Sequence, residues 1–421
     1  MELSMSYREP TAPRTMVSVN RTAEPQRPGG LRKRLTGIIG SGMIGYDPFD
    51  RKAWSGISYQ IFSRLRDQGC LHRAFGVEVA RLRKWLLMLR HVHPNRRIWR
   101  EHYYMSQSYR DSLTRVVGQR LQPDDFEHDF FVLGAVYDVP RLVEGRSHCF
   151  SYHDGNLVQS LQSPYAPTGL SVKRIEEGMS FERKVYERTD RILVMSEYLR
   201  RSFVEDYGIP ASRVAVVGAG VNLDEIPQVF PSKRYDTQQI LFIGVDFARK
   251  GGLLLLKAFR AVRAVHRNAT LHIVGPVELH LPAELASGVI HHGFLNKSIP
   301  SDAARLDELF RVCSVFVMPS LYEPFGIALL EAMVHQIPAV VSRAWALEEI
   351  VTPGITGEHV EPGSIDDLVE RLRTMLANPD LLQRLGVAAR AAVLERYTWP
   401  QVISRIIAEI SAVQEQPRPS S

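Results

Sequence analysis

The feature that most constrains this chain is a short apolar run that leads into the pattern of a capped helix. The run Ser-Val-Phe-Val-Met-Pro-Ser at 314–320 is β-branched and aromatic, which is typical of a buried strand in a parallel sheet. Glu323 then stands where a helix would be capped, and Pro324 falls at the first helical position, where its missing N–H is tolerated. An apolar face follows over 329–334, and Pro338 ends the element. The stretch predicts a strand, a loop and a helix.

The start of this predicted helix has the character of an anion site. The backbone N–H groups of Phe325, Gly326 and Ile327 would be unpaired there, and free donors and the helix dipole both favour a phosphate. Two glutamates bracket the site, since eight helical residues rise about 12 Å. Glu323 could accept hydrogen bonds from a sugar, and Glu331 could hold the two hydroxyls of a ribose, because each carboxylate offers two acceptor oxygens. Taken alone, the pattern also fits an amphipathic helix with one capping and one solvated glutamate.

The whole string resembles a known family signature. Glu323, Pro-Phe-Gly and Glu331, with the matching segments 318–320 and 338–342, resemble the signature of the retaining glycosyltransferases of family 4. The resemblance extends from about Leu35 to Trp399 and is strongest in the second half. It implies a hexosyltransferase-type enzyme with the GT-B fold, which uses a nucleotide diphosphate sugar and keeps its anomeric configuration. It also implies a role in the synthesis of cell-surface polysaccharides or glycoconjugates.

The order of elements supports that fold. Strands and helices alternate in both halves, which predicts an α/β protein with two facing doubly wound parallel-sheet domains. The active site would lie in the cleft between them, at the carboxyl ends of the strands. The predicted segments are a disordered basic extension (1–34), an acceptor-side domain (35–225), a nucleotide-sugar-binding domain (226–400), a helix that crosses back to the first domain (401–414) and a tail (415–421).

Length and composition are compatible with this interpretation. At 421 residues the chain can bury two cores, and its net charge of +6 suits acidic substrates or an anionic membrane. No apolar run reaches the roughly eighteen residues of a membrane span, and the first residues lack the core of a signal peptide. Three widely separated cysteines indicate reduced thiols. The expected location is the cytoplasm, with peripheral attachment to the inner face of the membrane as a further option.

The first predicted strand begins at Leu35 and runs into a glycine-rich loop. A second turn of small residues then opens a helix that ends near Gly69, with Ser55 as the expected N-cap. In the family a glycine in this region lies against the donor diphosphate and the acceptor. Gly56 matches that position best, and Gly42 and Gly45 are the alternatives. Glycines in turns also serve purely steric needs.

His153 follows the predicted strand 149–152. Sheets of this class place their ligands at the carboxyl ends of strands, where an imidazole can hydrogen-bond a sugar. The family has a histidine beside the reacting centre at this place, which implies a catalytic role for His153. The alternative is a turn residue that makes a local hydrogen bond.

Two cations follow the first strand of the second half. In the family an arginine comes directly after the glycine that matches Gly244, and a lysine follows several residues later. Lys250 matches the lysine, whereas Val245 replaces the arginine, so Arg249 is expected to supply the guanidinium. Fixed cations stabilise the charge that develops on a departing diphosphate. An Arg-Lys pair in a loop is otherwise ordinary solvated surface.

The remaining expectations concern the base, metals and cofactors. The family resemblance places Phe294 or Leu295, after the predicted strand 289–294, against the nucleobase. No Asp-x-Asp occurs in the chain, and His291 and His292 lack a third ligand at a recognised spacing. The sequence therefore predicts neither a metal nor a cofactor. Competing interpretations are a phosphorylase-like enzyme, an epimerase and a non-catalytic nucleotide-sugar-binding scaffold at the membrane surface.

Basic and aromatic residues gather in the first half. The segment 80–92 has the pattern of an amphipathic helix with four cations, and 96–120 combines six arginines with Trp and Tyr side chains. Such a mixture suits an anionic membrane surface, and the segment 96–120 is the candidate for that contact. An ordinary solvated helix explains it as well, and nucleic acid is not an expected partner. The acceptor would be a glycan, a lipid-linked sugar or a small molecule.

Overall fold

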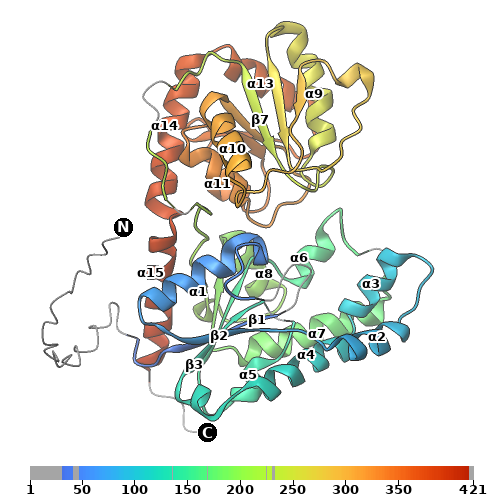
Figure 1. The fold of residues 1–421 in the computed structure, drawn as a ribbon, viewed down its shortest axis with the longest axis vertical. Helices are drawn as coiled ribbons and strands as arrows, with labels where there is room; N and C mark the ends of the chain where they lie inside the picture. Colours follow the sequence, from blue (N-terminus) through green and yellow to red (C-terminus); the bar gives the residue numbers. More distant parts are fainter. Residues whose placement is uncertain are drawn as a thin grey trace, which may run out of the picture.

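The computed structural model describes residues 31–40, 47–134, 136–167, 169–223, 225–229 and 233–416. Two domains lie one above the other along the long axis, and each is built on a six-stranded parallel sheet covered by helices (Figure 1). The predicted pair of doubly wound α/β domains is confirmed. Gly42 and Gly45, the extension 1–30 and the tail from 417 lie outside the described residues.

The first domain carries the strand order β2-β1-β3-β4-β5-β6. The inner strands are almost fully buried and the two edge strands only in part, because helices cover both faces of a parallel sheet. Its strands are β1 (Leu35–Gly40), β2 (Leu71–Val77), β3 (Asp129–Leu133), β4 (Cys149–His153), β5 (Arg191–Val194) and β6 (Val214–Val216). Its helices are η1 (Ala53–Gly56), α1 (Ile57–Asp67), α2 (Arg81–Leu89), α3 (Arg96–Tyr104), α4 (Gln107–Arg120), η2 (Pro123–Glu127), α5 (Val139–Val143), α6 (Leu157–Gln162), α7 (Val172–Arg188), α8 (Glu197–Glu205) and η3 (Ala211–Arg213).

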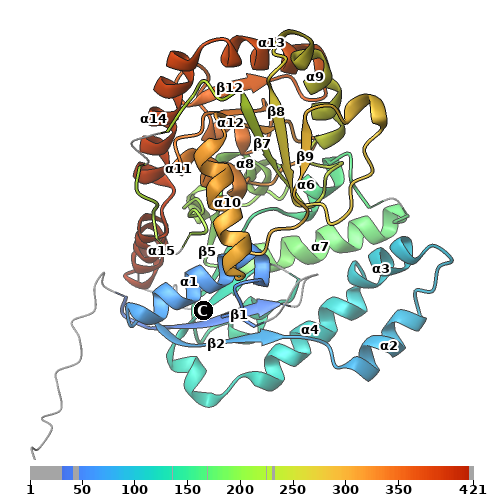
Figure 2. The ribbon, with the colours of Figure 1, turned by 45° about the horizontal axis from the view of Figure 1, so that its top comes forward.

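The second domain carries the order β12-β11-β10-β7-β8-β9 (Figure 2). The strand order reverses between the neighbours β7 and β10, and a reversal of this kind marks where open α/β sheets bind ligands. Its strands are β7 (Gln239–Ile243), β8 (Thr270–Val274), β9 (Val289–His291), β10 (Val315–Met318), β11 (Ala339–Ser342) and β12 (Gly357–Val360). Its helices are α9 (Gly252–Val265), η4 (Ala283–Leu285), α10 (Pro300–Val312), α11 (Ile327–Val334), α12 (Leu347–Ile350), α13 (Ile365–Leu376) and α14 (Pro379–Arg396).

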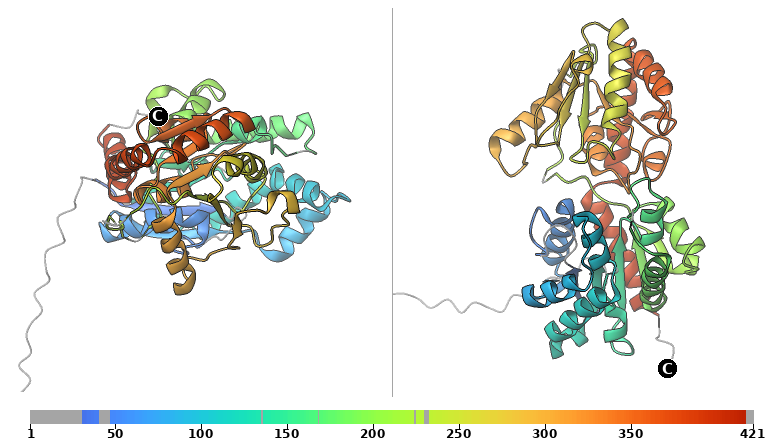
Figure 3. Two further views of the ribbon diagram at one scale, coloured as in Figure 1. Left: turned by 90° about the horizontal axis from the view of Figure 1, so that it is seen from above. Right: turned by 90° about the vertical axis from the view of Figure 1, so that its right-hand side faces the viewer.

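The last helix, α15 (Trp399–Gln414), returns to the first domain, where it contacts α1 and β5 (Figure 3). Its start is seated on the turn after β6: the Trp399 indole donates to Asn222 over 3.0 Å, and the Val221 amide donates to Tyr397 over 2.8 Å. Near its end, the Gln414 side chain donates to Asp129 at the start of β3 over 2.8 Å. Helix α15 therefore reaches from the carboxyl edge of the first sheet, at the turn after β6, to its amino edge, at the start of β3.

Two predicted helix starts are wrong. Ser55 does not cap α1, because Gly56 occupies the N-cap position in a left-handed conformation with φ +86°. Glu323 and Pro324 do not open α11 either: the helix begins at Ile327, and Gly326 is its N-cap with φ +98°. In both cases a glycine that tolerates positive φ sets the boundary, and propensity at the preceding residues does not.

The aromatic residues of the stretch 96–120 face inward. Tyr103 and Tyr109 are buried and their rings lie 4.8 Å apart, while the Trp99 indole donates to the Met88 carbonyl over 2.8 Å. The exposed positions of this stretch include five of its six arginines but no aromatic residue, and Arg110 is buried. The stretch is therefore not the mixed basic and aromatic surface that the sequence suggested.

Candidate active site

The loops after β7 and β10 meet at the reversal of strand order and form one unit. The Leu321 amide donates to the Arg249 carbonyl over 2.8 Å, which joins the two loops directly. Gly251, the N-cap of α9, has φ +76°, and a Cβ at this position would lie 2.0 Å from the Pro319 carbonyl oxygen. Only glycine fits between these loops, and this close approach brings the two predicted cations to the loop that carries Glu323.

Lys250, Arg249 and Glu323 form a charged cluster at this place. The Lys250 Nζ lies 2.8 Å from Glu323 Oε2, and Arg249 Nη1 lies 3.8 Å from the same oxygen. Arg249 is oriented by its hydrogen bond to the Tyr322 carbonyl at 2.7 Å and by Asp246 at 3.4 Å. Glu323 is buried and two cations surround it, so its charge is compensated. The structure thus brings together three residues that the sequence predicted separately.

The start of α11 lies next to this cluster. Among the described residues, the amide N–H groups of Phe325, Gly326, Ile327 and Ala328 have no hydrogen-bond acceptor. Phe325 is buried and packs edge-on against Tyr397 at 6.1 Å. These donors surround the left-handed Gly326 at the positive end of the helix dipole, so the start of α11 has groups that could bind an anion, and anion binding there stays a prediction.

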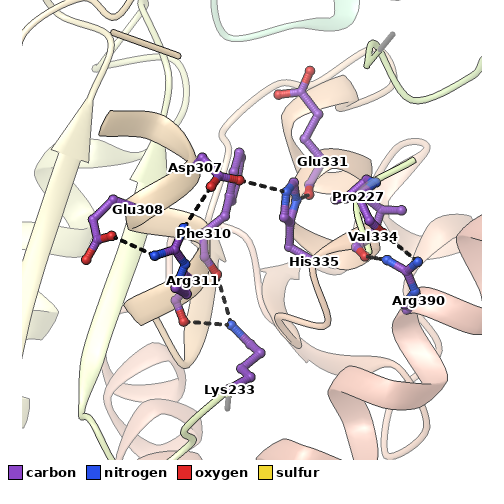
Figure 4. Close-up of polar contacts among 10 residues, drawn as sticks. All are labelled: Pro227, Lys233, Asp307, Glu308, Phe310, Arg311, Glu331, Val334, His335 and Arg390. Carbon is purple, nitrogen blue, oxygen red and sulfur yellow. Dashed lines mark hydrogen bonds and ion pairs between the residues drawn. The ribbon is translucent and has the colours of Figure 1, made fainter. Parts of the chain in front are cut away.

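Glu331 lies one turn into α11 and is almost fully buried. Its carboxylate forms an ion pair with Lys297 and points away from the His335 side, as Figure 4 shows. His335 stacks on Phe310 with 4.3 Å between ring centroids and holds the Glu331 carbonyl oxygen through Nδ1 at 2.7 Å. The backbone of Glu331 is thereby fixed, while its carboxylate is paired with Lys297.

The loop after β9 carries the residues expected at the nucleobase. Phe294 is exposed, whereas Leu295 is partly buried against the core that surrounds α11. The hydrogen bond from Gly275 to the Gly293 carbonyl, 2.9 Å, ties this loop to the one after β8. The two residues lie on the same chain segment as Lys297, which pairs with Glu331. The structure contains no direct contact of theirs that defines a base site.

The first domain contributes the end of β4. His153 is buried, with its ring 5.5 Å from Tyr186 and 5.2 Å from Phe203, and burial lowers the pKa of the imidazole to about 3. Its Nε2 has no hydrogen-bond partner among the described residues. No described contact joins His153 to Arg249, Lys250 or Glu323. The neutral ring faces the aromatic core, and its catalytic role stays a prediction.

Asp154, which sequence reasoning passed over, faces the second domain more directly. Its carboxylate accepts a hydrogen bond from the Trp54 indole at 3.0 Å. Burial raises the pKa of Asp154, and the nearby charge of Glu323 raises it further, while the Trp54 bond opposes the shift. The signal that could have found Asp154 is its place directly after a strand that ends at the sheet's ligand edge.

Gly56, the last residue of η1, is buried against the turn after β6. A Cβ there would lie 3.2 Å from the Arg51 carbonyl oxygen and 3.5 Å from Asn222 Nδ2, and φ is +86°. Asn222 also donates to the Ser55 carbonyl and accepts from Trp399, so it links η1 to α15. The geometry shows a steric reason for glycine at this position. Its predicted contact with a donor diphosphate is untested.

One contact across the domains was not foreseen. Glu349 of α12 accepts hydrogen bonds from the amides of Glu197, at 2.7 Å, and Tyr198 at the start of α8. Ser196 caps the next amide, that of Leu199, at 3.1 Å. Burial raises the pKa of Glu349, and these two amide bonds oppose the rise. A carboxylate of the second domain therefore completes a helix of the first.

The described residues contain neither a membrane-spanning helix nor a metal-binding cluster. No helix among them is long and apolar enough to cross a bilayer. No group of three or more His, Cys, Asp or Glu side chains among them is arranged to hold a metal ion.

Comparison with known proteins identifies the class. The family model "Glycosyl transferases group 1" matches residues 226–392, and "Glycosyltransferase Family 4" matches residues 60–225. The fold is that of sucrose-phosphate synthase from Thermosynechococcus elongatus (TM-score 0.66, 16% identity, 89% of this chain and 97% of that chain) and of HepE from Anabaena in complex with UDP (TM-score 0.61, 16% identity, 90% and 100%). These matches define a two-domain GT-B protein.

The chain belongs to the GT-B glycosyltransferases of group 1 and family 4. Among curated relatives, the phosphatidyl-myo-inositol mannosyltransferase of Mycobacterium leprae is 31% identical over 231 residues, which cover 53% of this chain and 60% of the relative. The alignments with the first four relatives span between 57% and 64% of the relatives' own length.

Proposed function

We propose that this protein is a retaining glycosyltransferase that moves a sugar from a nucleotide diphosphate sugar to an acceptor hydroxyl. The observation that carries the proposal is the cluster of Lys250, Arg249 and Glu323 beside the free amides at the start of α11. Cations, backbone donors and a carboxylate acceptor are the groups that a diphosphate and a sugar need together. Family membership and the GT-B fold favour the same reaction.

The residues have distinct roles in this proposal. The diphosphate binds at the amides of 325–328, and Lys250 and Arg249 turn from Glu323 to the phosphate oxygens. Glu323 is then free to accept hydrogen bonds from the sugar, and Glu331 exchanges Lys297 for the ribose hydroxyls. Because these cations can neutralise the leaving group, the proposed reaction needs neither a metal ion nor a cofactor.

The proposed step is a front-face substitution. The bond from the anomeric carbon to the phosphate oxygen breaks, and the acceptor oxygen forms its bond on the same face. The departing phosphate oxygen takes the acceptor's proton, so the nucleoside diphosphate leaves with the charge that Lys250 and Arg249 stabilise. Glu323 is not assigned as a covalent nucleophile, because two cations already hold its carboxylate.

His153 is proposed to hydrogen-bond the transferred sugar. An unpaired buried ring nitrogen is unfavourable, and a sugar hydroxyl would relieve that cost. Gly56 is proposed to lie against the diphosphate and the acceptor, and Phe294 or Leu295 against the base. HepE was crystallised with UDP, which makes a uridine nucleotide the first candidate.

The acceptor is proposed to be a glycan, a lipid-linked sugar or a small molecule in polysaccharide or glycoconjugate synthesis at the cytoplasmic side. The relative named for phosphatidyl-myo-inositol makes a lipid acceptor a plausible class. A non-catalytic scaffold at the membrane surface is not favoured, because the charged cluster retains the cations and the carboxylates that the reaction uses.

The test is donor hydrolysis with a panel of UDP-, GDP-, ADP- and CDP-sugars. We expect slow release of one nucleoside diphosphate, lost in Glu323→Ala and in Lys250→Ala and unchanged by a chelator. The anomeric configuration of the product, read by NMR, decides between retention and inversion. If no nucleotide sugar binds, the proposed site is wrong, and the alternative of a non-catalytic scaffold is favoured. If a chelator abolishes release, metal independence is wrong.

A further inference from the structure

The outward face of α2 carries large apolar side chains that nothing in the described part of the chain covers. Leu82, Trp85, Leu86 and Leu89 are 75%, 60%, 57% and 59% exposed. They occupy positions i, i+3, i+4 and i+7, so they form one stripe along the helix. Scattered exposed apolar residues are normal, whereas four on one helical stripe with a tryptophan at its centre mark an interaction surface.

The opposite face of α2 holds the helix in place. Leu87 is buried in the core that also contains Tyr103 and Tyr109. Arg83 donates to Ser112 of α4 over 3.2 Å, and the indole of Trp99 on α3 caps the Met88 carbonyl at 2.8 Å. The stripe is therefore not part of the core, because the opposite side of α2 already packs there.

Positive charge borders the stripe on both sides. At about 100° per residue, Arg81 and Arg90 fall roughly a quarter turn to either side of the stripe's centre. Exposed Arg96, Arg97 and Arg100 follow on α3, which contacts α2. Seven Lys and Arg stand between residues 78 and 105 against two acids. Both acids are already paired, Glu78 with Lys84 at 4.0 Å and Glu101 with Arg97 at 2.9 Å.

We propose that the outward face of α2 binds the surface of an anionic lipid bilayer. The apolar stripe enters the boundary between headgroups and acyl chains, and the flanking arginines meet lipid phosphates. In Figure 1, α2 and α3 lie at the edge of the first domain opposite α15. This assignment replaces the segment 96–120, in which Tyr103 and Tyr109 are buried, with the stripe on α2 and leaves α3 to supply charge.

The charge of this surface favours an anionic bilayer over two other partners, a second copy of the chain and a nucleic acid. A second copy of the chain docked through the same face would bring two sets of arginines together, which is unfavourable. A nucleic acid would meet the charge but would leave the apolar stripe in water. An anionic bilayer satisfies both parts of the surface. The inference does not rest on the proposed function, because binding to a bilayer needs no turnover.

The experiment is co-sedimentation of the full chain with vesicles of phosphatidylcholine alone or with one-third phosphatidylglycerol, at about 0.1 M and about 0.5 M salt. The stripe variant is Trp85→Ser with Leu89→Ser, and the charge variant is Arg81→Gln with Arg90→Gln. The matched control is Val265→Ser, at the last residue of α9, with Arg267→Gln in the turn that follows, and both residues are also exposed. Donor hydrolysis and sedimentation velocity are measured on every variant.

We expect the wild type and the control to bind the anionic vesicles at low salt and to be released by high salt. The charge variant should lose about thirtyfold in affinity, because each arginine near an anionic surface contributes about 1 kcal/mol. The stripe variant should lose at least as much, with donor hydrolysis unchanged in all. The proposal is overturned if the wild type stays in the supernatant, if the stripe variant binds as the wild type does, or if the stripe changes fail to affect vesicles and instead dissolve a dimer.

Discussion

The two domains build their sides of the candidate site in different ways. In the second domain, Lys250 and Glu323 follow adjacent strands and contact each other directly at 2.8 Å. In the first domain, Asp154 follows β4 and Trp54 comes from η1, and η1 is itself linked through Asn222 to α15. One side is local to a single sheet edge, whereas the other depends on segments from four parts of the chain.

This difference shows which sites can be specified by short sequence motifs. Where the strand order reverses, two loops that are about seventy residues apart are neighbours by topology alone, so each needs only a short motif. The first domain has no such motif for Trp54 or Asn222, because tertiary contacts position them. We therefore expect a single substitution on the second domain's side of the site to cause a large loss of activity. A single substitution on the first domain's side should cause only a partial loss.

The largest effect should come from the charged cluster. Lys250→Ala should slow donor turnover about a thousandfold, equivalent to about 4 kcal/mol, because it removes a fixed cation from the leaving diphosphate. Turnover is measured as release of nucleoside diphosphate, with Lys257→Ala on the exposed side of α9 as the control. If Lys250→Ala slows donor turnover by less than about tenfold, the second domain's side of the site is not more sensitive to single substitutions than the first domain's side.

The close approach of the two loops should be the next most sensitive feature. Gly251→Ala should lower the free energy of unfolding by about 3 kcal/mol, since it combines positive φ with a clash against the Pro319 carbonyl. Gly354→Ala is the matched control: its φ is +72°, but nothing lies near its Cβ, so about 1 kcal/mol is expected. Denaturant titration measures both. Equal losses would show that conformation, and not contact, fixes this turn.

Buried histidines should make both domains sensitive to acid. Burial lowers the pKa of His335 to about 4 and that of His153 to about 3, so the folded state holds both rings neutral. The unfolded state takes up these protons below about pH 6.5, and the free energy of unfolding should fall by about 2 kcal/mol per histidine between pH 7 and pH 5.

Unfolding titrations at the two pH values check this expectation. His335→Gln and His153→Gln should each remove about 2 kcal/mol of the acid loss, whereas His280→Gln, at an exposed position, should remove none. Asp307 faces His335 at 4.0 Å and favours its protonated form, while Lys233 and Arg390 oppose it. An unchanged pH profile in His335→Gln would mean that the ring accepts its proton in the folded protein.

The contact between the domains should give the smallest effect. Glu349→Ala leaves the amides of Glu197 and Tyr198 without their acceptor, which should lower the free energy of unfolding by about 1 kcal/mol, as for the loss of a helix cap. Glu348→Ala, exposed on the same helix, is the control. Small-angle scattering should also show a wider distribution of domain separations in Glu349→Ala only. Identical scattering from both variants would show that the carboxylate does not hold the domains together.

The sequence predicted the fold because its strands carry nearly continuous apolar runs and alternate with helical patterns. The family resemblance assigned Glu323 and Lys250 to the donor site one by one, and the structure places the two side chains in contact. It misplaced the start of α11, because propensity favours Pro324 at a first turn while the backbone requires the left-handed Gly326. Asp154 and Glu349 were missed for another reason: their partners, an indole and two backbone amides, are distant in sequence and carry no local signal.

The surface of α2 was half predicted. The amphipathic period of 80–92 was visible, but an apolar stripe says nothing about which way it faces. The aromatic residues of 96–120 were assigned outward because they alternate with arginines, whereas Tyr103 and Tyr109 complete the core beneath α2. Only the packing of α2 on α3, of α3 on α4 and of α4 on β2 could decide the orientation.

The return of α15 to the first domain sets an order of events during synthesis. The first sheet is complete once Val216 has left the ribosome, yet the helix that covers α1 and β5 and binds Asp129 is not made until residues 399–414. At about 5–20 residues per second, the emerging chain spends roughly 10 to 40 seconds with that flank of the nascent domain bare. The second domain is thus translated in full before α15 can cover the first.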